Sequence, residues 1–576
     1  KTAYEIRLSL VGSEMCIRDR RMLDLARKNS IVPPEIYSEK GRTAEDAVLH
    51  QVLAYDIARQ TRAPLIVASV DAAQCYDRIA HSIADLTLRA SWVPESSIRC
   101  MLKPIREMEF FIKTAFGESD SYVGGKESPK QGSCQGNGGA PPTWQQISTT
   151  MLGAHRRAGH GVTVKSPISN KSCTMAGIMY VDDTNLWTGM KPEEDLDSVH
   201  GDAQEAINSW GNLLLSTGGA LNPDKCKWTV HDMVTKSDGT WEYRVCKSEL
   251  GTIQEGQEYP GTKHDLEREE DVTEDIDSLE MRVPQAGARD ARIDQLQSCQ
   301  AMKNLGLYTP PDGKSEPQFQ ALRARVNEWT ADVANSGLPT RSVWKSYQCQ
   351  LWSGMKYGLG ASPATLKQLK KGLDKRDHKL LSYLGVCKKI TTPLRYLPAC
   401  YGGVGLNSLV AEATTASLNS FLQHYGTETA IGTYLTASLE NLQLELGVSG
   451  CPLNYDYDVW GKLATDSWVK SLWERVCRFK IKLDIEYKKL PPPWENDECI
   501  MEKLVREGVR GTQLTNLNRV RKHQEALFLS DIVTANGRRL DPIYLSSWHE
   551  SYDCLLYTSD AADEGLGVDL GGRRII

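Results

Sequence analysis

The chain has 576 residues, which at about 150 residues per domain is enough for three or four domains. Hydrophobic residues make up 40% and charged residues 25%, the composition of a globular protein that buries a sizeable core. The net charge of -6 excludes nucleic-acid binding through an overall basic charge, so such binding would need local basic patches.

Cysteine spacing and hydropathy indicate the compartment. The 15 cysteines include no C-x-x-C pair and no cysteine-histidine cluster at zinc-ligand spacing, which favours a reducing compartment without a zinc knuckle. No apolar run approaches bilayer length, and the N-terminus lacks the layout of a signal peptide. We expect an intracellular protein, cytoplasmic or nuclear, with no membrane partner.

Both ends have an unusual sequence. "VGSEMCIRD", Val11 to Asp19, and "CLLYTSDAADE", Cys554 to Glu564, resemble translations of opposite strands of one sequencing adapter. We therefore expect residues 1–20 and 553–576 to be assembly artefacts outside the fold.

The first half of the chain alternates predicted helices and strands. "LIVASVD", residues 65–71, is a continuous apolar run typical of a strand buried on both faces. A helix over 77–91 follows, with Asp77 as its N-cap. By periodicity and turn residues we also predict helices over 41–64, 143–158 and 195–219, and strands over 109–116, 174–189 (two, around a turn) and 225–233.

The second half is predicted to be mostly helical. An acidic block at 255–280 has no apolar periodicity and is typical of a solvated linker. Residues 318–385 are predicted to be helical and basic, and residues 399–552 helical and rich in tryptophan.

Two adjacent aspartates, Asp182 and Asp183, interrupt the strand pair at 174–189. Mid-strand neighbours face opposite sides of a sheet, but at a hairpin turn both carboxylates can approach one point. A lone pair of aspartates is more often an ordinary turn. Asp71, at the end of the buried strand, changes this interpretation, because three carboxylates could hold two Mg²⁺ ions about 4 Å apart for phosphoryl displacement.

In order and spacing, "VASVDAAQCYDRI", "GSCQGNGGAP", "MYVDD" and "GGALNPDKCKW" resemble the palm motifs of reverse transcriptases, most closely those of non-LTR (LINE-like) retrotransposons. The resemblance spans about Gly41 to Trp228 and is weaker as far as Leu406 and beyond. It implies an RNA-directed DNA polymerase, a nucleotidyltransferase that uses an RNA template, a DNA primer, deoxynucleoside triphosphates and two Mg²⁺ ions, or Mn²⁺ in their place.

The resemblance also implies roles for single residues. Asp71, Asp182 and Asp183 would bind the metal ions, and Lys225 would protonate the leaving pyrophosphate unless it is a plain surface lysine. Tyr76 would exclude a 2'-hydroxyl on the incoming sugar, or be an ordinary core tyrosine. Gln135 and Gly136 would approach the nucleotide in a loop where Ala140 replaces the family's serine.

Part of the fingers pattern is missing. Glu39 stands where the family has a basic residue, which leaves Lys40 and Arg42 as the nearest groups to grip a triphosphate. No endonuclease signature and no convincing ribonuclease H set is present in the sequence.

Several segments are candidates for nucleic-acid contact. "KNLGLYT", Lys303 to Thr309, resembles the primer-grip hairpin. A helix over 366–386 would contact template-primer phosphates or be a solvated face. Its basic residues include Lys367, Lys370, Lys371, Lys375, Arg376 and Lys379. A second basic candidate contains Arg519, Arg521 and Lys522.

We therefore predict an α+β right-hand polymerase with an antiparallel palm sheet, a helical thumb and incomplete fingers. The predicted parts are partial fingers (21–63), palm with fingers segments (64–253), acidic linker (254–290), end of palm and helical thumb (291–398) and helical C-terminal extension (399–552). Two alternatives stay open: a catalytically dead element remnant that only binds nucleic acid, and an RNA-dependent RNA polymerase, which Tyr76 and "YVDD" disfavour.

Overall fold

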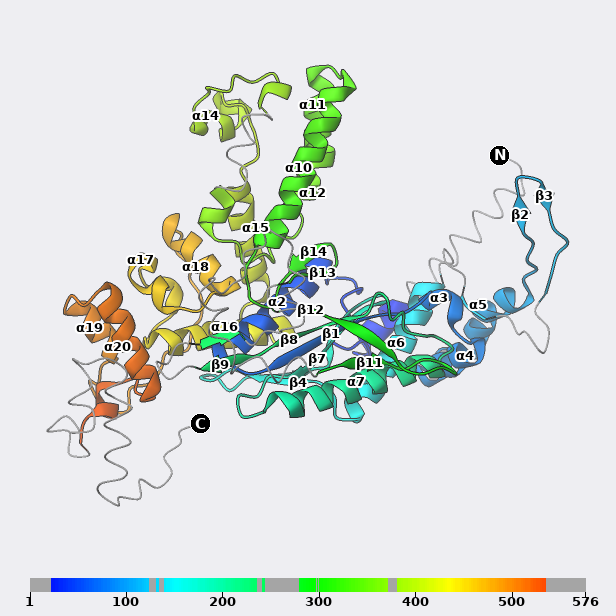
Figure 1. Cartoon of the computed structure of the whole chain (residues 1–576), viewed down its shortest axis with the longest axis horizontal. Helices are drawn as coiled ribbons and strands as arrows, with labels where there is room; N and C mark the ends of the chain where they lie inside the picture. Colours follow the sequence, from blue (N-terminus) through cyan, green and yellow to red (C-terminus); the bar gives the residue numbers. More distant parts are fainter. Residues whose placement is uncertain are drawn as a thin grey trace.

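A computed structural model describes residues 22–123, 131–133, 139–235, 241–243, 279–296, 298, 300–370 and 381–534. Figure 1 shows a central sheet flanked by helices, a column of helices rising from it, and further C-terminal helices at one end. The predicted artefact segments, 1–20 and 553–576, lie outside the described residues. No helix within the described ranges combines the length and apolar composition needed to cross a membrane.

The central sheet has six strands in the order β11-β12-β8-β1-β7-β6. They are β1 (Leu65–Asp71), β6 (Gly177–Tyr180), β7 (Asp183–Gly189), β8 (Lys227–His231), β11 (Met281–Val283) and β12 (Ala291–Leu296). Neighbouring strands are antiparallel except β12, which is parallel to β8. The prediction of an antiparallel sheet is confirmed for the central strands and wrong for the β8–β12 pair. These two strands are parallel, because a long connection and not a hairpin joins them.

The acidic segment predicted as a linker over 254–290 ends earlier than expected. Met281 and Val283 are fully buried and Arg282 between them is exposed, the alternation of a strand with one face on the core. These residues form β11, so the predicted linker boundary at residue 290 is wrong. The sequence pattern did not predict this strand, because it is only three residues long and follows a strongly charged run.

β1 is buried on both faces, as its continuous apolar sequence predicted. Leu65 and Val67 belong to a core shared with α2 (Ala44–Thr61) and the C-terminal helices. The residues that alternate with them belong to the opposite core, beneath α6 (Ala140–Arg157) and α7 (Leu196–Ser216). Burial on both sides holds β1 in the middle of the sheet and brings Asp71 to the end of it.

Two short helices replace the single helix predicted over 77–91. α3 (Cys75–Arg78) and α4 (His81–Ala90) are separated by two residues with extended backbone. Asp77 lies inside α3, and Ala80 is the N-cap of α4, so the predicted cap at Asp77 is wrong. A tertiary contact explains the break, because the Ala80 N–H donates to the carbonyl of Thr217 at 2.8 Å.

Most other elements predicted in the first half are confirmed. α6 begins at Ala140, before the predicted start at 143, because two prolines occupy its first turn, where they need no N–H partner. The predicted strand over 109–116 is reduced to one short hairpin strand. The smaller elements here are α5 (Glu95–Glu107), β2 (Lys113–Thr114), β3 (Gly117–Glu118), β4 (Val162–Lys165), β5 (Ser172–Met175), β9 (Met233–Thr235) and β10 (Trp241–Tyr243).

The column of helices has a hydrophobic core of its own (Figure 1). It contains α10 (Glu316–Ser336), α11 (Thr340–Ser346), η1 (Tyr347–Trp352), α12 (Ser353–Lys356) and α14 (Thr392–Tyr396). At its base, β13 (Met302–Asn304) and β14 (Leu307–Thr309) form a hairpin. Leu305 and Gly306 between them both have positive φ, as a two-residue hairpin turn requires.

The C-terminal helices complete the core on one face of the sheet. α16 (Ala430–Leu446) and α18 (Trp468–Arg478) contribute large side chains to the same core as α2, including the fully buried Trp468 and Trp473. The predicted helical extension is therefore helical in its described part, but it is built into the sheet's core. Its other elements are η2 (Ala399–Tyr401), α15 (Leu409–His424), η3 (Pro452–Asn454), α17 (Tyr457–Trp460), η4 (Gly461–Leu463), α19 (Ile500–Arg506), α20 (Gly511–His523) and η5 (Leu529–Ile532).

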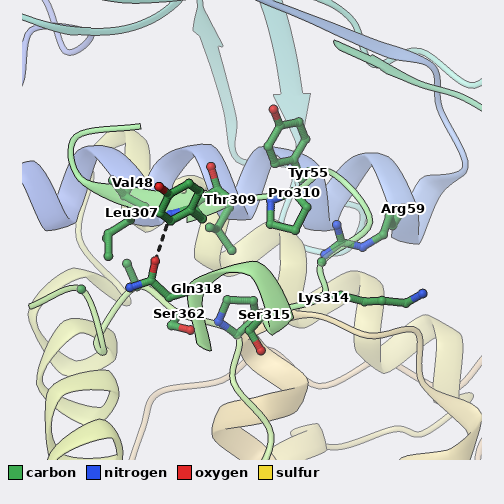
Figure 2. A pocket seen from close by; sticks show the side chains of 16 residues that line it. Val48, Tyr55, Arg59, Leu307, Thr309, Pro310, Lys314, Ser315, Gln318 and Ser362 are labelled. Atoms are coloured by element: carbon green, nitrogen blue, oxygen red, sulfur yellow. Dashed lines mark hydrogen bonds between the residues drawn. The ribbon is translucent and has the colours of Figure 1, made fainter. Parts of the chain in front are cut away.

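A buried ion pair joins α2, the base of the column and the C-terminal helices. The Arg59 guanidinium contacts the Asp56 carboxylate and donates to the carbonyls of Pro311 and Asp466. Asp56 also accepts the backbone N–H of Trp468 at 2.7 Å. Burial raises the pKa of Asp56 to about 6, although Arg59 lowers it. Figure 2 shows Arg59 beside a cavity of about 20 Å³, room for about one water molecule.

Three buried histidines predict a loss of stability in acid. Burial lowers the pKa of His50, His155 and His231 from the ordinary 6.5 to about 3. Between these values the unfolded chain binds protons that the folded chain does not, so stability is present above pH 6.5 and falls as the pH falls. Each histidine contributes about 1.4 kcal/mol per pH unit to the slope of the unfolding free energy.

Urea unfolding between pH 6.5 and 5 measures this slope. His231→Phe should reduce the slope of the unfolding free energy by the contribution of one histidine, about 1.4 kcal/mol per pH unit. Both ring nitrogens of His231 are buried without a hydrogen-bond partner among the described residues. The exposed Trp92 provides the control, since Trp92→Phe removes no titratable group and should leave the slope unchanged. An equal slope in His231→Phe and the wild type would contradict the assignment.

Candidate active site

The two adjacent aspartates lie at a hairpin turn, as predicted. β6 ends at Tyr180 and β7 begins at Asp183, so Val181 and Asp182 form a two-residue turn. Val181 has a φ of 61°, a left-handed conformation that is strained for a β-branched residue. The turn frees Asp182 from the alternation of the strand and keeps both carboxylates at one end of the sheet.

Asp71 lies directly opposite Asp183 on the neighbouring strand. Directly paired residues of antiparallel strands face the same side of the sheet with Cβ atoms about 5 Å apart, and like charges there are destabilising. Lys225 supplies a compensating cation, because its Nζ lies 3.4 Å from Asp71 Oδ2. The four predicted catalytic residues are therefore brought to one place.

The electrostatics of these residues are coupled. Burial raises the pKa of Asp183, the charges of Asp182 and Asp71 raise it further, and Lys225 lowers it. Burial and then Asp182 raise the pKa of the nearby Cys75 thiol to about 12. The end of the sheet is thus a partly buried, negatively charged region in which a cation would be stabilised.

The carboxylate ligands of this site suit a hard divalent cation. Carboxylate oxygens are the ligands that Mg²⁺ prefers, with water and phosphate completing its octahedron. In the described part of the chain, however, no three acidic, histidine or cysteine side chains converge closely enough to form a complete ion site. Binding would require Lys225 to release Asp71 and the carboxylates to draw together around the ion.

Neighbouring segments hold the carboxylates in place. The Trp144 indole N–H of α6 donates to the carbonyl of Val181 at 2.7 Å, which fixes the hairpin turn. The Asn222 N–H donates to the carbonyl of Asp71 at 2.9 Å, and the Asp71 N–H contacts Cys226 Sγ at 3.5 Å. The segment that carries Lys225 is therefore tied to the end of β1.

Sequence reasoning missed Trp144 as an anchor of the turn. It lies in the helix after the glycine-rich loop, and nothing in its spacing indicates a polar contact with residue 181. Asn222 and Cys226 lie inside the quoted motif "GGALNPDKCKW", so the motif was the available signal for them.

Tyr76 lies in α3, half-buried, and packs against the core beneath the carboxylates. Its carbonyl accepts the backbone N–H of Ser133 at 2.7 Å, which joins α3 to the start of the glycine-rich loop. Gly132 has a φ of 86°, and a Cβ there would lie 2.5 Å from the carbonyl oxygen of Asp77, so only glycine fits. Gln135 and Gly136, predicted to contact the nucleotide, lie outside the described residues.

The predicted triphosphate-gripping residues have different surroundings. The Arg42 guanidinium donates to the carbonyls of Pro33 and Ile36 at 2.9 and 2.6 Å and so holds the loop before α2. Lys40 is exposed. Glu39 is buried and accepts from Gln145 at 2.5 Å. The side chain of Lys40 is free to contact a triphosphate, whereas Arg42 would first have to break its hydrogen bonds to the loop.

The predicted nucleic-acid contacts are described only in part. Lys367 and Lys370 are exposed on the helical segment that begins at Leu366, while Lys371 and Lys375 lie outside the described residues. In the second basic candidate, Arg521 is buried and its guanidinium donates to backbone carbonyls. The prediction that Arg521 contacts nucleic acid is therefore wrong.

Comparison with known proteins gives no family. No protein-family model and no curated protein matches the chain. Among solved structures, telomerase from Candida tropicalis in complex with a TWJ fragment of telomeric RNA is 12% identical, with 73% of this chain and 56% of that chain covered and a TM-score of 0.30. The corresponding Candida albicans complex is 10% identical, with 83% and 57% covered and a TM-score of 0.28.

A third structure, apo telomerase from Candida tropicalis truncated from its C-terminal domain, is 12% identical, with 40% of this chain and 42% of that chain covered and a TM-score of 0.27. The chain thus spans about half the length of these proteins. At such TM-scores the likeness carries no argument about this chain, so the site itself has to carry the functional interpretation.

Proposed function

We propose that the chain is a reverse-transcriptase polymerase of non-LTR retrotransposon type. It would add deoxynucleotides to a primer 3'-hydroxyl on an RNA template and release pyrophosphate. The observation that supports this most directly is the pairing of Asp71 with Asp183 across two central strands, with Asp182 at the adjoining turn. These residues belong to the motifs that resemble the family, and the fold brings them together.

The chain's own residues would divide the chemistry between them. Asp71, Asp182 and Asp183 would hold Mg²⁺, which when bound activates the attacking hydroxyl and stabilises the leaving oxygen. Lys225, already beside Asp71, is placed to give a proton to the departing pyrophosphate. Tyr76 would present a rigid ring against the 2' position of the incoming sugar.

The surrounding parts would hold the substrates. The column built on α10 would serve as the thumb, with the β13–β14 hairpin as primer grip at its base. Lys367 and Lys370 would contact template-primer phosphates as point charges, together with Lys371 and Lys375 of the same segment.

Primer extension tests the proposal. A labelled DNA primer on an RNA template, with Mg²⁺ and deoxynucleotides, should be lengthened by the chain. Tyr76→Ala should raise ribonucleotide incorporation relative to deoxynucleotide incorporation about tenfold or more, because the variant loses the steric exclusion of a 2'-hydroxyl. Tyr122→Ala, at an exposed tyrosine on another segment, is the control and should leave the ratio unchanged.

The outcomes separate the alternatives. Wild-type extension with ribonucleotides alone would favour an RNA-dependent RNA polymerase. Binding of the primer-template without any extension would favour a remnant that binds nucleic acid but does not catalyse, the alternative to which the incomplete convergence of the carboxylates points.

A further inference from the structure

A positively charged site lies between the end of α2, α16 and α20. It is a cavity of about 450 Å³, within the size range of ligand-binding pockets. Its lining contains Arg62, Arg519, Lys522 and His523, against the single carboxylate of Glu445. The cavity therefore has an excess of positive charge.

The orientation of α20 creates this charged wall. Arg519, Lys522 and His523 are spaced i, i+3 and i+4, which places them on one face of the helix. Arg521 points the other way, and its guanidinium donates to the carbonyls of Leu444 and Glu445 in α16 at 2.9 and 3.0 Å. These buried hydrogen bonds fix the rotation of α20 and turn its basic face toward the cavity.

The positive charge is only partly neutralised. Lys522 Nζ lies 3.2 Å from Glu445 Oε1, and the same carboxylate oxygen accepts the N–H and hydroxyl of Thr465. Burial lowers the pKa of Lys522, and Arg521 and Arg62 lower it further. The guanidinium groups of Arg62 and Arg519 have no ion-pair or hydrogen-bond partner in the described part of the chain.

Helix dipoles do not account for this arrangement. Cations are favoured at the C-terminal turns of α2 and α20, which is where these residues lie. A single cation at each helix end would be enough for a favourable interaction with the helix dipole. The dipoles do not explain why the cations of two helices face one cavity.

The chemistry of the lining selects the ligand. Among the described residues around the cavity there is no Phe, Tyr or Trp, the large rings on which bases usually stack, and the lining is mainly cationic and polar. Guanidinium and ammonium groups bind phosphate oxygens strongly. We propose that this cavity binds a phosphate group of a nucleic-acid backbone, without regard to base sequence.

The site is separate from the carboxylates. Arg62 precedes β1, whereas Asp71 ends it, and a seven-residue strand spans about 20 Å. A strand bound here would be held at a distance from the proposed polymerisation site. The inference stands apart from the proposed reaction, because binding can be measured without metal or nucleotides.

Fluorescence anisotropy with a labelled 20-nucleotide single-stranded RNA tests the site. For the double variant Arg62→Gln and Arg519→Gln, we expect about tenfold weaker binding near 0.1 M salt. The slope of log K against log salt should become about 0.7 smaller, because the contact with one phosphate is lost. The control is Arg99→Gln with Lys103→Gln, which removes the same charge from exposed residues that already pair with glutamates.

Equal affinity and slope in the double variant and the wild type would overturn the proposal, as would failure of the wild type to bind RNA. Loss of ATP or inorganic phosphate binding, with RNA binding unchanged, would assign the cavity to a small phosphate ligand and overturn the backbone assignment.

A footprint on the wild-type chain does not depend on the folding of a variant. Bound RNA should protect Arg62 and Arg519 from phenylglyoxal, as read by mass spectrometry. Unprotected arginines at saturating RNA would also overturn the proposal.

Discussion

Asp71→Asn and Asp182→Asn are each expected to lower the rate of primer extension by about a hundred- to a thousandfold. Asparagine keeps the size of aspartate but removes the negative charge on which a divalent cation and the developing transition-state charge depend. The measurement is single-turnover extension at saturating Mg²⁺. Asp202→Asn, at an exposed position of α7, is the control and should retain the wild-type rate.

A third substitution at the site, Asp183→Asn, has a readout that does not need activity. Without Mg²⁺, Asp183→Asn should raise the free energy of unfolding by about 0.2 to 1 kcal/mol, because it removes a like charge directly opposite Asp71. Excess Mg²⁺ should reduce this gain if the ion binds the carboxylates. Full extension activity in Asp182→Asn would refute the proposed chemistry, whatever the stability result.

Asp56→Ala is expected to destabilise the chain by about 3 to 5 kcal/mol, because it leaves the Arg59 guanidinium buried without its ion-pair partner. The experiment is urea unfolding at pH 8, above the pKa of about 6 that burial gives Asp56, so that both partners are ionised in the wild type. The control is Asp466→Ala. That carboxylate pairs with Lys470 while 72% exposed, and its loss should change stability by less than about 1 kcal/mol.

Replacing both partners by apolar residues should recover much of this loss. Asp56→Leu combined with Arg59→Met removes both buried charges and keeps the volume filled. If Asp56→Ala proved no more harmful than Asp466→Ala, the pair would not be the link between α2, the column and the C-terminal helices.

Helix and strand positions in the first half of the chain followed from local pattern. The apolar run at 65–71 has a strong pattern of its own, which tertiary contacts reinforce. The turn at 181–182 was signalled by its aspartates, although Val181 adopts a left-handed backbone there. The split at Ala80 did not follow, because a hydrogen bond to Thr217, distant in sequence, decides it. The strand at Met281–Val283 is short and depends on a free edge of the sheet.

By itself, the sequence determined which carboxylates belong to the candidate site, since Asp71 ends a buried strand and Asp182 and Asp183 interrupt another. Only the tertiary structure decided that Asp71 faces Asp183 in register, that Lys225 compensates Asp71, and that Arg521 turns inward while Arg519 lines a cavity. The physical reason is that strand register and helix rotation depend on contacts between segments far apart in the chain. Local composition carries no record of them.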